Sequence, residues 1–442
     1  MIEQNNNQFK RKILYLIWLI TIVAFLLLPT RVNFRIDSYC VCFILYILAL
    51  LLFFLIKQKK NYFDFDTIFL IISSLMFFLA PFYAENEIFP RLFIVGFDSD
   101  LIIKGTLLAS VGLESYMIGS VIKYNPPQKT PQINFPKGEI FAQLFILCSI
   151  IFVLSGGIDF YRSTYNSEYS QDVSPTGLIQ QMIPLMVVFA NLYCVSVFLK
   201  FQKCKQQKWL YLIYIFLFSF VIALIGNRTL FSNIVLPFVL CYFSFVKNLS
   251  WRKSSVLFMI GVFFMSIIQI TRTGDSYYSR SLILMFTDLT IPSSTLYNTL
   301  EYVDINGITY LKTMLAPLIG CVPGMGSMFA NINSYSSASV LTEYMITDSW
   351  MEGVGMGSTI ISDLYLGSGI IGVVFFMIIL GRWINILNNN KGLNYMIVEC
   401  AFFASCIFMC RSSYFYPTRF IIWSLLVIYG YNFLIKCSKR NY

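Results

Sequence analysis

The chain has 442 residues, of which 57% are hydrophobic and only 12% are charged, and its mean hydropathy is +0.70. Soluble domains average about 25% charged residues, so this composition excludes an ordinary soluble protein and indicates a polytopic membrane protein. The net charge of +10 would suggest nucleic acid only on a soluble surface. Its placement in short connectors predicts membrane topology instead, and no nucleic-acid partner is expected.

The sequence contains no histidine. This excludes catalytic arrangements built on histidine and removes the usual ligands of zinc and haem. The 11 cysteines include no CxxC pair, and most of them lie in apolar runs, where we interpret them as small buried hydrophobic residues. We therefore expect neither a metal site nor a cofactor.

The apolar stretches predict an all-α fold with about twelve transmembrane helices in one integral membrane domain, residues 1–442. Each stretch has about the 17 to 25 residues that a span requires. Three basic residues precede the first stretch and no small-residue cleavage site follows it, so we expect an uncleaved first span. The predicted spans are 13–29, 38–56, 66–83, 101–122, 139–155, 177–199, 209–225, 230–246, 255–271, 364–386, 395–411 and 419–436.

Charge predicts the orientation of these spans. About two thirds of the 32 basic residues fall in connectors on the same side as the N-terminus, whereas most acidic residues fall on the other side. The positive-inside rule then predicts that both termini are cytoplasmic. It also places the longest connector, residues 272–362 between spans nine and ten, outside the cell membrane.

This outer loop is rich in aromatic, acidic and glycine residues, a composition that is unusual for a disordered segment. We expect it to form a subdomain with short helices that caps a site at the membrane surface. Aromatic rings can stack on the faces of sugars, and the candidates for this role are Tyr277, Tyr278 and Trp350.

Five arginines are predicted at the outer ends of spans or in the outer loop, where the positive-inside rule does not favour basic residues: Arg228, Arg272, Arg280, Arg411 and Arg419. A guanidinium group binds phosphate through two hydrogen bonds and stays charged. A cluster of such arginines at the outer leaflet would suit the binding of a lipid-linked pyrophosphate. The alternative is that these side chains reach lipid headgroups or pair with nearby acids.

Without histidine, acidic residues on the outer side are the candidates for a general base. Asp275, Glu352 and Asp363 are the predicted catalytic residues, and most other acids of the loop are expected to be solvated. Lys104, Glu114 and Glu399 lie within predicted spans, where an ionisable group is a functional candidate by default. Ten residues, or nearly three helical turns, separate Lys104 from Glu114, so these two do not pair directly.

Three stretches together resemble the Wzy-type oligosaccharide repeat-unit polymerases of bacterial surface polysaccharides. The first is GNRTLFSNIVLPFVL, with a Gly-x-Arg turn between two spans. The second is NGITYLKTMLAPLIGCVPG, and the third is GVGMGSTIISDLYLGSGIIGVVFFMIILG, at the exit of the long loop. The resemblance covers about residues 220–385 in motif and the whole chain in topology.

The resemblance implies a GT-C-like glycosyltransferase of the bacterial cytoplasmic membrane. It would transfer a growing glycan from undecaprenyl pyrophosphate to an incoming lipid-linked repeat unit, giving O-antigen, capsule or exopolysaccharide. The phosphate-binding role would pass most directly to Arg228. Asp363 stands where relatives often have an acid, and the missing histidine argues against the related ligases. Expected partners are lipid-linked oligosaccharides, membrane lipids, and the flippase and chain-length regulator of the same pathway.

Two other classes stay open at this point. A lipid-linked oligosaccharide flippase would have a similar number of spans and would also need basic residues. It should, however, concentrate charge in a central cavity and keep its outer loops short. A scaffold protein of the assembly complex is the third possibility, although the sequence contains no distinct interaction domain.

Overall fold

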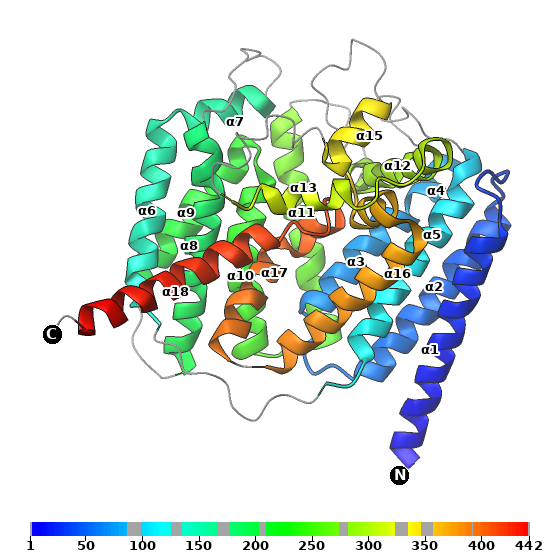
Figure 1. The fold of residues 1–442 in the computed structure, drawn as a ribbon, viewed down its shortest axis with the longest axis horizontal. Coiled ribbons are helices and arrows are strands. Elements are labelled where there is room, and N and C mark those ends of the chain that lie inside the picture. The colour runs from blue at the N-terminus through cyan, green and yellow to red at the C-terminus, as the bar shows by residue number, and fades with distance from the viewer. Residues whose placement is uncertain are drawn as a thin grey trace.

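The computed structural model describes residues 2–85, 99–124, 135–165, 177–202, 209–273, 282–322, 335–345, 357–390 and 392–440. Every regular element in these residues is a helix, so the all-α prediction is confirmed for this part of the chain. Figure 1 shows most helices side by side in a bundle, with the N-terminus at one end and α7, α12 and α15 at the other.

Every predicted span coincides with a helix or, in one case, with two consecutive helices. Eight helices of the described chain are long and apolar enough to cross a membrane, and α6 and α9 are shorter apolar helices. The chain is therefore a polytopic membrane protein, while the total of about twelve spans stays a prediction. The helices are α1 (Ile2–Leu27), α2 (Ile36–Lys57), α3 (Phe65–Phe78) with α4 (Ala80–Glu85), α5 (Ile102–Val121), α6 (Gly138–Leu154), α8 (Gly177–Gln202), α9 (Trp209–Ile225), α10 (Arg228–Phe245), α11 (Trp251–Thr273), α16 (Ile360–Asn389), α17 (Leu393–Cys410) and α18 (Thr418–Arg440).

The remaining elements are the 3-10 helix η2 (Ser99–Leu101) and the helices α7 (Gly157–Tyr165), α12 (Leu282–Asn306), α13 (Lys312–Ile319) and α15 (Ser337–Met345). The last three fall in the predicted outer loop. Helices α13 and α15 are short, as expected, but α12 has 25 residues. Several of its polar side chains bond back to their own helix, as the Thr299 hydroxyl does to the Thr295 carbonyl (2.6 Å). These bonds let a Ser/Thr-rich helix that contains Pro292 be buried.

Helix α5 is at the centre of the bundle, and its candidate membrane span is buried along its whole length. Glycines bring its backbone into direct contact with α16. A Cβ atom added at Gly119 would lie 2.0 Å from the carbonyl oxygen of Ile378, and one at Gly381 would lie 2.1 Å from that of Tyr116. Only residues without a side chain permit this close approach, as in other membrane helix pairs.

Two of the ionisable residues predicted within spans attach α1 to α5. The ammonium group of Lys104 donates hydrogen bonds to the carbonyls of Phe25 and Leu28 at the end of α1. Glu114 accepts a hydrogen bond from the Thr21 hydroxyl (3.3 Å). These contacts give both side chains a role in helix packing, because a polar group in the membrane must find a partner inside the protein.

Replacing Gly119 by alanine should destabilise the fold. The new methyl group would overlap the α16 backbone, and overpacking of this kind costs about 1–3 kcal/mol or more. We expect the purified protein in detergent to unfold at a temperature several degrees below that of the wild type. Gly430→Ala is the matched control, because a Cβ there meets nothing within 4 Å. Equal melting temperatures for the two variants would contradict the proposed contact.

Candidate functional site

The turn between α17 and α18, residues 411–417, is fastened to two other helices. The backbone N–H of Tyr414 donates to Oδ2 of Asp363 in the first turn of α16 (2.9 Å). The hydroxyl of Tyr416 and the side-chain amide of Asn233 on α10 are 2.9 Å apart. The ends of α10, α16, α17 and α18 therefore meet around this turn.

Asp363 is positioned by the start of α16. Thr359 caps the helix, and its hydroxyl oxygen accepts the N–H of Ser362 (3.0 Å). An acid in the first turn suits the positive end of the helix, and Asp363 is completely buried. Its Oδ1 atom makes no hydrogen bond within the described residues, and Ser337 of α15 lies beside the carboxylate.

Arg419 lies in the first turn of α18 and is held by neutral groups. Its guanidinium donates to the side-chain oxygen of Gln181 on α8 (3.0 Å) and lies 4.6 Å from the centre of the Trp423 ring. The indole N–H of Trp423 in turn donates to the carbonyl of Cys321 (2.7 Å), which follows α13. Within the described residues, no carboxylate pairs with Arg419. A half-buried cation with neutral neighbours can bind an anion such as phosphate.

Asn233 and Tyr416 connect the arginines at two helix ends. Arg228 is the first residue of α10, which is capped by the Asn227 side chain (2.9 Å to the N–H of Leu230). With its amide nitrogen 2.7 Å from the Ala404 carbonyl, Asn233 joins α10 to α17 and accepts the Tyr416 hydroxyl. Burial raises the pKa of Tyr416 to about 12, against the opposite effects of Asn233 and Arg419, so this hydroxyl stays protonated.

The structure places only some of the predicted site residues. Arg411 is the exposed C-terminal cap of α17 and begins the same turn. Arg272 lies in the last turn of α11, and its side chain is not described. The other predicted residues fall outside the described part of the chain: Asp275, Tyr277, Tyr278, Arg280, Trp350 and Glu352.

Sequence reasoning missed four residues that hold this arrangement: Gln181, Asn233, Tyr414 and Tyr416. An asparagine inside an otherwise apolar span was the available signal for Asn233. The two tyrosines stand in the polar turn between the predicted arginines. Their partners are distant in the chain, so only the fold could reveal the pairs.

Two of the stretches that carry the family resemblance are hydrogen-bonded to each other. Helix α16 is interrupted at Gly369, whose φ is 64°, a left-handed conformation that favours glycine. The N–H of Thr309 donates to the Leu366 carbonyl (2.8 Å) and that of Leu311 to the Gly367 carbonyl (2.7 Å). The segment before α13 thus satisfies carbonyls freed near the interruption and is fixed over the start of α16.

The described residues also contain a group of buried thiols, from Cys194, Cys241 and Cys400, with sulfur atoms within 4.8 Å of one another. Three thiolates could bind a soft metal ion. They would also place several negative charges in the apolar core between α8, α10 and α17, which is costly. Neutral thiols that pack as small hydrophobic groups fit this environment better.

Comparison with known proteins identifies the family. The family model for O-antigen polysaccharide polymerase Wzy matches residues 11–441, nearly the whole chain. No curated protein and no solved structure matches. The match confirms the resemblance that the three stretches suggested. The chain therefore belongs to the O-antigen polysaccharide polymerase Wzy family, membrane glycosyltransferases that polymerise lipid-linked repeat units.

Proposed function

We propose that this enzyme joins undecaprenyl-pyrophosphate-linked oligosaccharide repeat units at the outer face of the cytoplasmic membrane, with both of its termini in the cytoplasm. Its family already makes it a glycosyltransferase that acts on lipid-linked repeat units. The observation that carries the finer proposal is the turn 411–417. This turn brings Asp363 together with the arginine-bearing ends of α10, α17 and α18.

Contacts along α5 support the proposed side of the membrane. Lys104, near the start of α5, bonds to the end of α1, which is the end remote from the N-terminus. Tyr116, near the other end of α5, contacts Gly381 late in α16. Because the late parts of both helices meet, α16 runs parallel to α5, and its first turn with Asp363 lies on the side away from the N-terminus. The charge distribution favours that side as the outer one.

In the proposed reaction, a hydroxyl of the acceptor sugar attacks the anomeric carbon of the donor glycan. A bond forms between that carbon and the hydroxyl oxygen, and the bond to the pyrophosphate oxygen breaks. Arg228, Arg411 and Arg419 would bind the pyrophosphate and stabilise its growing negative charge. Asp363 is the candidate base that would accept the proton of the hydroxyl. Arg272 and Arg280, with the loop residues Asp275, Tyr277, Tyr278, Trp350 and Glu352, stay candidates for phosphate, acceptor and sugar contacts.

The flippase alternative can be tested in cells. The family favours a polymerase, since its members polymerise lipid-linked units. In a strain that lacks this chain, we expect single repeat units on the carrier lipid to accumulate at the outer leaflet. Mass spectrometry of the lipid-linked intermediates, with and without a probe that labels only the outer leaflet, measures this. Repeat units trapped on the inner leaflet would instead indicate a flippase.

Replacing Arg419 should strongly reduce polymerisation. We expect Arg419→Ala to reduce the amount of polymer about 10²-fold, as for loss of one charge-stabilising donor in other enzymes. Arg419→Lys should recover little, because an ammonium group lacks the planar fork that reaches Gln181 and packs on Trp423. The length ladder of the surface polysaccharide on a gel measures the product, at matched protein level.

Arg382→Ala is the control for Arg419, because Arg382 is an exposed arginine near the other end of α16. It should leave the ladder intact. A normal ladder from Arg419→Ala would remove Arg419 from the proposed pyrophosphate site.

The substitution Asp363→Asn distinguishes a catalytic base from a residue that only accepts a structural hydrogen bond. The asparagine oxygen can still accept the N–H of Tyr414, so the turn should stay in place. An amide cannot accept a proton, and general-base catalysis contributes about 10²–10⁴-fold. We therefore expect a loss of that size in polymer formation with an unchanged melting temperature. If Asp363→Asn were active while Asp363→Ala were not, Asp363 would only hold the turn.

A further inference from the structure

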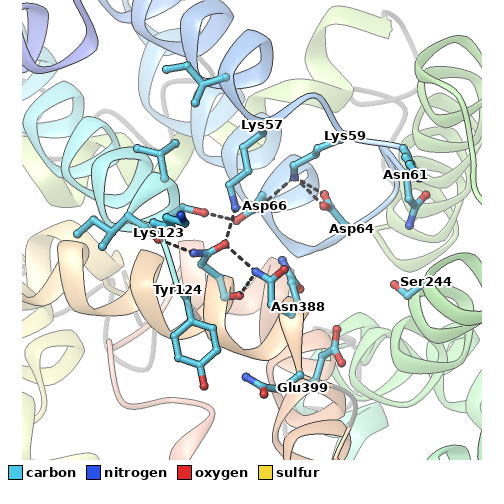
Figure 2. A pocket seen from close by; sticks show the side chains of 18 of the residues that line it. Lys57, Lys59, Asn61, Asp64, Asp66, Lys123, Tyr124, Ser244, Asn388 and Glu399 are labelled. Carbon is cyan, nitrogen blue, oxygen red and sulfur yellow. Dashed lines mark hydrogen bonds and ion pairs between the residues drawn. The ribbon is translucent and has the colours of Figure 1, made fainter. Parts of the chain in front are cut away.

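A second polar site lies at the other end of α16. A cavity of about 460 Å³ opens there, where α2, α5, α10 and α16 end and α3 begins (Figure 2). This volume is within the range of small-molecule sites, about 300–1,000 Å³. The charged side chains that line it are Arg11, Lys57, Lys59, Lys60 and Lys123, together with Asp64, Asp66 and Glu399. Five basic groups against three acidic ones leave an excess of positive charge.

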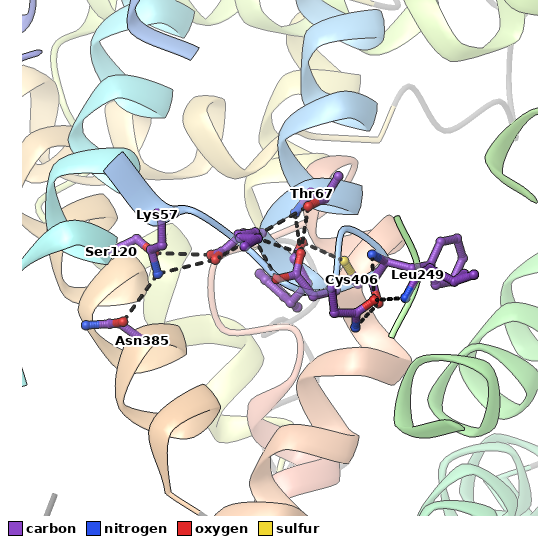
Figure 3. Close-up of polar contacts among 12 residues, drawn as sticks. Lys57, Thr67, Ser120, Leu249, Asn385 and Cys406 are labelled. Atoms are coloured by element: carbon purple, nitrogen blue, oxygen red, sulfur yellow. Dashed lines mark hydrogen bonds and ion pairs between the residues drawn. The ribbon is translucent and has the colours of Figure 1, made fainter. Parts of the chain in front are cut away.

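The floor of this cavity is a charge-balanced network (Figure 3). Lys59 is 2.6 Å from the carboxylate of Asp64 and 3.0 Å from that of Asp66, and Lys57 is 3.5 Å from Asp66. Asp66 also accepts the hydroxyl of Ser120 (3.2 Å), and Lys57 donates to Asn385 (3.2 Å). Burial would lower the pKa of Lys59, but Asp64 and Asp66 outweigh it and raise this pKa. Two lysines and two aspartates therefore neutralise one another and fix the floor.

The rim carries the excess charge. Lys60 and Lys123 are exposed residues that line the cavity, and neither has a hydrogen-bond or ion-pair partner within the described residues. The Nε atom of Arg11 is buried at the same cavity and also lacks a hydrogen bond there. Glu399 is the one lining acid that the floor network does not use. The rim thus presents several hydrogen-bond donors and a net positive charge.

We propose that this cavity binds a phosphate-bearing anion. Ammonium, guanidinium and amide donors suit phosphate oxygens, and Asn388 adds an amide to the lining. Asn385 and Asp363 are 22 residues apart in α16, which would span about 33 Å if the helix were straight, close to the thickness of the hydrocarbon core. The cavity therefore lies level with the lipid headgroups of the opposite leaflet. The phosphate could belong to such a headgroup or to a small soluble molecule, and the site does not depend on the reaction at Asp363.

The test compares two double variants of the purified full chain in neutral detergent. Lys60→Gln/Lys123→Gln removes two rim charges. Lys247→Gln/Lys253→Gln, the control, removes one exposed charge from the connector between α10 and α11 and one from the first turn of α11, both outside the cavity. Thermal unfolding is followed with increasing phosphatidylglycerol in phosphatidylcholine mixed micelles, and separately with inorganic phosphate. The melting shifts give an apparent dissociation constant for each probe.

We expect at least one probe to raise the melting temperature of the wild type. The rim variant should bind that probe about tenfold or more weakly, and the control variant should match the wild type. A shift with phosphatidylglycerol alone assigns the site to a headgroup, and a shift with inorganic phosphate assigns it to a soluble phosphate. Absence of both shifts in the wild type, or equal weakening in the control, would overturn the proposal.

Discussion

The backbone contact between α5 and α16 positions both polar sites of this protein. Because α16 carries Asp363 at one end and Asn385 at the other, the crossing at Gly119 and Gly381 fixes the separation and depth of both. Together with α1, α2, α3 and α12, α16 buries α5 on all sides, so that every polar group on that helix needs a partner inside the protein. Lys104 and Asp66, which bonds to α5, are satisfied in this way at opposite ends.

The interruption of α16 at Gly369 connects this central pair to the candidate site. A break in a membrane helix frees carbonyl groups, and protein must satisfy them because lipid cannot. Here the N–H groups of Thr309 and Leu311 do so, and the same contact brings α13 against α16. The carbonyl of Cys321, just after α13, then accepts a hydrogen bond from the indole N–H of Trp423, next to Arg419. A local break in one helix thus positions part of the predicted loop beside the candidate phosphate-binding arginine.

Hydropathy and charge were enough to predict the helices, because each span must be long and apolar by itself. They were insufficient for α12, because its Ser, Thr and Asn residues interrupt the apolar pattern of the helix, although several of their side chains bond to carbonyls of the same helix. The pairs Asn233–Tyr416 and Gln181–Arg419 join residues far apart in the chain, and local sequence carries no signal for them. Likewise, the sequence shows Lys60 and Lys123 only as basic residues of two connectors on the side of the N-terminus. A charge count cannot show that these two connectors line one cavity.

The two sites differ in how the protein treats their positive charges. At the cavity floor, Lys57 and Lys59 are buried and are neutralised by Asp64 and Asp66. Arg419 is also partly buried, yet its described partners are an amide oxygen and an aromatic ring. Withdrawing a cation from water without a counter-charge is costly, and such an arrangement is stable when an anion completes it. The missing negative charge at Arg419 is what a pyrophosphate would bring, whereas the floor of the cavity already contains its own.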